Sequence, residues 1–329
     1  MNYIQQAYTG LYDWWRYLVG IIIIFAFWQI IGMIPLLVFI GIEVFNGADM
    51  SITTDIAQMA ALLGNNLFLF LMLFSFAVGL VGVILSSKFL HKQSFRQLTT
   101  TRPKIDWSRF WFIFIVWGVF SLGTTYLSYY FSPEDYIFNF NLKPFLILCA
   151  LIIFLMPLQT SFEEYLFRGY LMQGIGVLFK NRWAPLLLTS VGFGLLHGMN
   201  PEVDKLGPIM MVFYIGTGLI LGIMTLMDDG LELALGFHAA NNMFTALLVT
   251  SDWSALQTDA LLTLTADPAE MAITEIVAPV VIVYPILLII LSKKYGWTNW
   301  KEKLFGKVEL PVEDDFQTIE SRENYKILD

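Results

Sequence analysis

Charged residues are scarce in this chain. They make up 14% of its 329 residues, whereas 57% are hydrophobic, and an ordinary soluble domain carries about 25% charged residues. The shortage excludes a soluble enzyme with one large core, because the apolar surface would have no place away from water, and the composition also excludes disorder, collagen and coiled coil.

Basic residues and cysteines are also few. Nineteen Lys and Arg stand against 27 Asp and Glu, a net charge of -8, so the chain offers no basic face for nucleic acid and we expect no such partner. The single cysteine, Cys149, excludes disulfides within the chain and any cysteine-rich metal site. It lies in an apolar run, and we interpret it as a small core residue.

Long stretches without charge are abundant. A helix needs about 20 apolar residues to cross a bilayer. Eight stretches lack Asp, Glu, Lys and Arg: 17–42, 56–87, 110–133, 144–162, 183–201, 206–227, 233–251 and 276–292. We therefore predict an all-α fold, a polytopic membrane helical bundle with about eight transmembrane helices in contact with the lipid bilayer. The first stretch is too long for a signal peptide, and the fourth should continue as an apolar helix to about Phe179.

The positions of Lys and Arg predict the orientation, because these residues collect in cytoplasmic loops. Most of them lie in four places: before the first stretch, at 88–109, at 180–182 and at 293–294. Both termini and the 88–109 loop are thus expected in the cytoplasm, with the protein in a bacterial plasma membrane.

The same reading divides the chain into four parts: N-terminal transmembrane helices with a basic cytoplasmic loop (1–143), a core with the polar motifs (144–250), the last transmembrane helix (251–296) and a polar cytoplasmic tail with a short helix (297–329).

Three charges interrupt the fourth apolar region, where charge is costly and usually functional. Glu164 and Arg168 are separated by four residues, so they can pair on one helix face. Glu163 is rotated by about 100° from Glu164 and has no local cation. Such a carboxylate holds a proton more readily and suits a general base. The alternative is a buried polar cluster whose only role is to fix the packing of the helices.

Two of the three histidines also lie in apolar stretches. Phe193 and His197 share a helix face, so the ring can pack under the imidazole, and His238 shares a face with Asn242. Asn241 is rotated by about 60° from His238. His91 lies in the basic loop and is expected to be solvated. A carboxylate and an imidazole can activate water, and a second imidazole with an amide can stabilise an oxyanion. This set would hydrolyse a peptide bond without a serine or cysteine nucleophile.

Other intramembrane protease motifs are absent. The sequence contains no HExxH, GxGD or GxSG, and its Met-Asp-Asp-Gly at 227–230 resembles a third zinc-ligand motif only vaguely. The glycines around Gly216 and Gly218 are interpreted as helix-packing residues.

Three short motifs occur in order: EEYLFRG at 163–169, FGLLH at 193–197 and HAANN at 238–242. They resemble the EExxxR, FxxxH and HxxxN motifs of the CPBP (Abi) family of intramembrane proteases, which includes the type II CAAX prenyl endopeptidases. The resemblance covers about 144–250 and implies an all-α membrane endopeptidase.

Carried over, the resemblance makes Glu163 the water-activating base with His197 as its partner, and His238 and Asn242 the oxyanion donors. Glu164, Arg168 and Phe193 would support the site. Glu163, His197 and His238 could in principle ligate zinc, but we favour a mechanism without a metal or other cofactor. The substrate would be a membrane-associated peptide or protein, prenylated or not.

Two alternatives use the same polar residues. One is a non-catalytic scaffold or a peptide-binding or immunity protein; the other is a proton-coupled transporter, which the lack of repeated halves disfavours.

The predicted depths of the polar residues in the membrane do not agree. At about 1.5 Å per residue, Glu163 and His197 should lie about 21–24 Å from the cytoplasmic ends of their spans, but His238 only about 10 Å. Either span seven begins earlier than its charges suggest, or the helices tilt around a cavity open to the cytoplasm.

Overall fold

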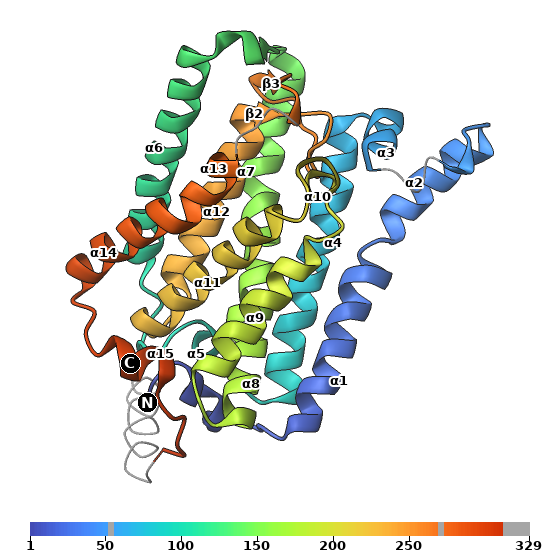
Figure 1. Ribbon diagram of the computed structural model, residues 1–329. Coiled ribbons are helices and arrows are strands. Elements are labelled where there is room, and N and C mark those ends of the chain that lie inside the picture. The colour runs from blue at the N-terminus through green and yellow to red at the C-terminus, as the bar shows by residue number, and fades with distance from the viewer. Residues whose placement is uncertain (52–55, 269–272, 312–329) are drawn as a thin grey trace, which may run out of the picture.

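A computed structural model describes residues 1–51, 56–268 and 273–311, and this part of the chain is a bundle of helices (Figure 1). The longer helices, in chain order, are α1 (Trp14–Phe25), α2 (Ile34–Phe45), α4 (Asn65–Leu85), α6 (Trp107–Phe131), α7 (Leu142–Glu164), α9 (Trp183–Leu196), α11 (Met210–Asp228), α12 (Glu232–Leu248) and α14 (Tyr284–Tyr295). Shorter helices are α3 (Ile56–Leu63), α5 (Phe95–Thr99), α8 (Met172–Phe179), α10 (Pro201–Leu206), α13 (Ile273–Ala278) and α15 (Trp300–Phe305).

Six helices of the described chain are long and apolar enough to span a membrane: Trp14–Phe45, Asn65–Leu90, Trp107–Phe131, Leu142–Phe179, Met210–Asp228 and Ile273–Tyr295. The fourth runs to Phe179 as predicted. The fifth and seventh charge-free stretches form α9 and α12, of 14 and 17 residues, so each is shorter than any of the six candidate spans. The second stretch divides at Gly64, whose φ of +81° ends α3 before α4 begins.

Wide, π-type turns interrupt several of the spans. They are η2 (Ala26–Ile31), η4 (Ser86–Leu90), η6 (Tyr165–Leu171) and η8 (Pro279–Val283), and two 3-10 turns are η1 (Ile4–Thr9) and η5 (Pro133–Asp135). A π-bulge inside a helix is rare and often marks a functional site. The segment η6 begins directly after Glu164, so the wide turn carries Arg168.

A small sheet closes one end of the bundle. Strand β1 (Tyr136–Phe138) pairs antiparallel with β3 (Leu262–Leu264), and β2 (Val249–Thr250) pairs parallel with β3. Figure 1 shows β2 and β3 at the end of the bundle opposite to the N-terminal segment and α15. The two ends of the molecule are therefore built differently.

Apolar side chains both fill the interior and cover the outside. Helix α12 packs against α6, α7 and α11, and α9 packs against α11. Gly218 brings α9 and α11 together, because a Cβ at this position would lie 2.7 Å from Ser190 O; Gly216 meets Val280 in the same way, which confirms their packing role. Large apolar residues such as Ile22, Leu37 and Phe154 are exposed on the outer helix faces. The chain is an integral membrane protein.

Three acidic residues at the junction of α11 and α12, Asp228, Asp229 and Glu232, form what we call the basal acidic cluster. Arg102 contacts two of them, at 2.8 Å to Asp228 and 3.1 Å to Glu232. The backbone N–H of Leu231 donates to Thr99 O of the basic loop at 2.8 Å. The loop therefore covers the start of α12.

The N-terminal segment and α15 also cover the start of α12. Tyr3 N donates to Asp229 Oδ1 at 3.1 Å, and Lys303 of α15 forms an ion pair with Asp229. The first residue of α12, Glu232, is only 1% exposed. His238 is close to the start of its helix, yet it is deep in the protein because that start is itself covered. The helix predicted for the tail is α15; residues 312–329 lie outside the described residues.

His91 is buried, and the prediction that it is solvated is wrong. Its side chain is enclosed because the N-terminal segment folds back over the 88–109 loop. Nδ1 bonds Leu11 O and Nε2 bonds the Tyr170 hydroxyl, both at 2.7 Å. Burial lowers the pKa of His91. This histidine joins the N-terminal segment to η6.

Candidate active site

Glu164 and Arg168 form the predicted ion pair. Arg168 Nη1 lies 2.9 Å from Glu164 Oε1, and both side chains are fully buried. Arg168 Nη2 also donates to Gly218 O at 3.0 Å, and its guanidinium lies 4.4 Å from the centroid of the Phe193 ring. The arginine therefore ties η6 to α11 and α9, which fits the supporting role predicted for Glu164, Arg168 and Phe193.

His238 lies between the two glutamates. Its Nδ1 is 2.8 Å from Glu164 Oε1, and its Nε2 is 3.6 Å from Glu163 Oε2. A carboxylate only accepts hydrogen bonds, so Nδ1 carries the proton and donates to Glu164. The Nε2 atom and Glu163 Oε2 face each other without a direct hydrogen bond, and Oε2 is buried with no other hydrogen-bond partner among the described residues.

The imidazole nearest to Glu163 is thus His238, whereas the resemblance paired Glu163 with His197. His197 follows the last residue of α9, where its Nδ1 bonds Phe193 O at 2.8 Å. Its ring packs on Phe193 and stacks on Tyr214, each with a centroid separation of 4.6 Å. The predicted Phe193–His197 contact is confirmed. In the described chain His197 makes no hydrogen bond to Glu163, although both side chains line one cavity.

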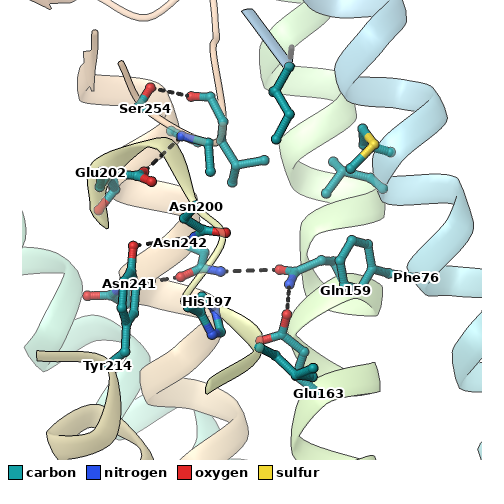
Figure 2. A pocket seen from close by; sticks show the side chains of 18 of the residues that line it. Phe76, Gln159, Glu163, His197, Asn200, Glu202, Tyr214, Asn241, Asn242 and Ser254 are labelled. Atoms are coloured by element: carbon teal, nitrogen blue, oxygen red, sulfur yellow. Dashed lines mark hydrogen bonds between the residues drawn. The ribbon is translucent and has the colours of Figure 1, made fainter. Parts of the chain in front are cut away.

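A chain of side-chain hydrogen bonds ends on Glu163. Trp117 Nε1 donates to Asn241 Oδ1 at 3.1 Å, and Asn241 Nδ2 donates to Asn242 Oδ1 at 3.2 Å. Asn242 Nδ2 then donates to Gln159 Oε1 at 3.2 Å, and Gln159 Nε2 donates to Glu163 Oε1 at 2.7 Å. Figure 2 shows the part from Asn241 to Glu163.

The two ends of this chain fix the direction of every bond. An indole N–H can only donate, and an ionised carboxylate can only accept, so each amide between Trp117 and Glu163 has one orientation. Asn242 retains one N–H that this chain does not use. It can still donate to an oxyanion next to Glu163.

A cavity of about 460 Å³ lies beside these residues. Glu163, His197 and Asn242 line it, whereas Glu164 and Arg168 lie behind its wall. From Glu163 the cavity extends to Thr245 and Val249 at the end of α12 and to the 250–256 segment, which is the β2–β3 end of the bundle in Figure 1. The cavity therefore extends away from the end of the bundle that holds the N-terminal segment and α15. If the termini are cytoplasmic, the helices do not tilt around a cavity open to the cytoplasm, which was one of the two explanations for the depth of His238.

Analysis of the sequence missed several polar residues of this cavity. Gln159, Asn200, Glu202 and Tyr214 all line it, and so does Asn241. A signal was available for Gln159, since it precedes Glu163 by four residues in an apolar helix and must face the same side. Asn241 received little weight because of its rotation from His238, but α6 supplies Trp117 as its partner.

The described residues do not form a cluster of metal ligands. Within residues 1–51, 56–268 and 273–311, no group of three or more His, Cys, Asp or Glu side chains is placed to hold a metal ion. Glu163, His197 and His238 do not converge on one point as a zinc site requires. The preference for hydrolysis without a metal stays a prediction.

Comparison with known proteins places this site in a family. No solved structure matches the chain. The chain is 32% identical over 254 residues to the uncharacterized protein YyaK of Bacillus subtilis (strain 168), a match that covers 76% of this chain and 83% of that protein. Residues 141–244, which contain Glu163, His197, His238 and Asn242, match the family model described as type II CAAX prenyl endopeptidase Rce1-like. The chain belongs to this Rce1-like family of membrane proteases.

Proposed function

We propose that this protein is an intramembrane endopeptidase that hydrolyses a peptide bond of a membrane-associated peptide or protein with an activated water. The observation that carries the proposal is the position of Glu163, which lines the cavity while His238 bonds Glu164 and faces Glu163 at 3.6 Å from behind the wall. A general base must lie within hydrogen-bond reach of its water. A water in the cavity within reach of the Glu163 carboxylate would meet this condition.

In this proposal Glu163 removes the proton from the water as it attacks the carbonyl carbon. The developing oxyanion accepts a hydrogen bond from the free N–H of Asn242, and His238 is the second donor in this proposal. His197, held by Phe193 and Tyr214, is then a second imidazole next to the substrate. Glu163 finally returns its proton to the leaving amine.

The test is cleavage of a membrane-anchored fluorogenic peptide by the purified full chain. Glu163→Gln keeps the shape of the side chain and removes its basicity, so we expect a loss of about 10²–10⁴-fold in kcat, with thermal unfolding unchanged. Thr160→Val is a matched control on the same helix, because the Thr160 hydroxyl bonds only the backbone carbonyls of Met156 and Pro157.

Each outcome separates the candidate functions. Cleavage by Glu163→Gln at the wild-type rate contradicts the assignment of the base. A biological function that persists in this variant indicates a binding protein, and proton-coupled uptake into vesicles indicates a transporter. Loss of activity with a chelator and recovery with zinc would turn Glu163, His197 and His238 into metal ligands.

We also propose that the termini and the 88–109 loop are cytoplasmic in a bacterial plasma membrane, on the basis of the Lys and Arg distribution. Cysteine labelling in a Cys149→Ala background tests this. A cysteine at the exposed Lys104 should be labelled only in permeabilised cells, and one at the exposed Glu134, near β1, in intact cells. The reverse pattern would refute the orientation.

A further inference from the structure

The described part of the cavity wall contains carboxylates but no Lys or Arg. Among the described residues that line it, the acidic side chains are Glu163 and Glu202, and the other titratable groups are His197 and Tyr214. Arg168 is fully buried behind the wall and paired with Glu164. A free carboxylate of a bound peptide would therefore meet two carboxylates and no Lys or Arg in the described part of this wall.

Glu202 is held with one oxygen unpaired. It belongs to α10, and its Oε1 accepts a hydrogen bond from Ala255 N at 2.8 Å. Its Oε2 is buried and has no hydrogen-bond partner in the described structure. Burial raises the pKa of Glu202, while the bond from Ala255 opposes this shift. A buried acceptor without a donor is destabilising, so a donor brought by a ligand would bind here favourably.

The surroundings of Glu202 suit a peptide. Asn200 and Tyr214 lie beside it and bond each other at 3.3 Å. Figure 2 shows Glu202 and Glu163 apart from each other, with Asn242 labelled between them. The remaining wall is largely apolar and includes Trp28, Phe76 and Phe162, among others. One cavity can thus hold an apolar chain between the site of hydrolysis and a second acidic position.

We propose that Glu202 is a specificity subsite that binds a cationic group of the substrate, either a Lys or Arg side chain or an amino terminus. The protein then processes apolar peptides with a positive charge near the scissile bond. It disfavours peptides that end in a free carboxylate next to that bond. The inference rests on the proposed peptidase function. It separates this chain from an activity that releases a short C-terminal peptide, since that substrate would place its carboxylate in an acidic cavity.

The experiment uses the full chain in lipid nanodiscs and one apolar, membrane-anchored, quenched fluorescent peptide. Lys, Gln or Glu is placed in turn at each of three positions on either side of the scissile bond, and each peptide is made with a free or an amidated C-terminus. We expect the wild type to prefer Lys over Glu at one position by about 10–100-fold in kcat/KM, mainly through KM, the range of a charge-assisted hydrogen bond. It should also prefer amidated to free termini.

Two substitutions test the residue itself. Glu202→Gln should remove the preference for Lys, and Glu202→Lys should reverse it in favour of Glu. Asp204→Asn is the matched control, because Asp204 lies on the same short helix, is exposed and does not line the cavity. The control should keep the preference of the wild type.

Failure of the subsite and failure of the function have different signatures. Equal cleavage of Lys, Gln and Glu peptides by the wild type, or faster cleavage of free than of amidated termini, overturns the subsite and leaves the peptidase intact. If no peptide is cleaved, the proposed function fails. Binding of the same labelled peptides to Glu163→Gln protein, measured by fluorescence anisotropy, then decides the subsite: a lower Kd for Lys than for Glu supports it, and equal values overturn it.

Discussion

Two groups of buried acidic residues, one at the junction of α11 and α12 and one at the end of α7, differ in how completely their oxygens are paired. In the basal acidic cluster, Asp228 accepts from Arg102, Arg109 and Trp297, and Glu232 accepts from Arg102 and from the backbone of Asp106. Every carboxylate oxygen of Asp228 and Glu232 has a donor.

The second group, which we call the intramembrane cluster, comprises Glu163, Glu164, Arg168 and His238. Oε2 of Glu163 and Oε2 of Glu164 are buried without a hydrogen-bond partner among the described residues, and Nε of Arg168 is also unpaired. The carboxylates of Asp228 and Glu232 are saturated, whereas Glu163 has an unpaired oxygen and lines the cavity. We therefore propose a structural role for the basal acidic cluster and a catalytic role for Glu163.

The largest expected effect comes from Arg168. Arg168→Ala should leave Glu164 as a buried carboxylate without its arginine, with only the bond from His238; breaking a buried ion pair costs about 3–5 kcal/mol, so expression and the temperature of thermal unfolding should both fall. Arg168→Lys should restore part of the charge but not the contacts to both Glu164 and Gly218. If the Arg168→Ala variant were as stable as the wild type but inactive, Arg168 would take part directly in the reaction. Its assignment as a supporting residue behind the cavity wall would then be wrong.

The next largest effect is expected at Asn242, which lines the cavity. Asn242→Ala should reduce kcat by about 10²–10³-fold, the range for one oxyanion donor, with peptide binding little changed. Asn241→Ala should cost less, since Asn241 acts through Asn242 and contacts Trp117 on its other side. Steady-state kinetics of the two purified variants make the measurement, and a larger loss for Asn241→Ala would reassign the oxyanion donor.

The smallest expected effect belongs to the basal acidic cluster. Asp228→Ala should lower stability by about 1–3 kcal/mol, the cost of leaving buried partners unpaired, while kcat per folded molecule stays at the wild-type value. Arg102 and Arg109 are about one fifth exposed, so water can solvate them after the change. Thermal unfolding together with active-site-normalised kinetics measures both quantities. A selective loss of kcat would show that this cluster controls the position of His238.

Much of this protein could be predicted from local rules. Helices in a bilayer need long apolar stretches, so the charge gaps predicted the spans, and the i,i+4 rule predicted the pairing of Glu164 with Arg168 and the contact of Phe193 with His197. The wide turn η6 did not disturb the first pair. The lengths of α9 and α12 were less predictable, because a charge gap counts the residues of a turn as well as those of its helix.

The sequence by itself determined which residues would be buried in the membrane and which polar groups would share a helix face, because both follow from hydropathy and from 3.6 residues per turn. Only the tertiary structure decided that His238 lies between Glu163 and Glu164, that Gln159 joins Asn242 to Glu163, that His91 is enclosed, and that the cavity extends away from the termini. These features join helices far apart in the chain. Their geometry depends on helix crossing and on the close approach that residues such as Gly218 permit, and no local pattern encodes it.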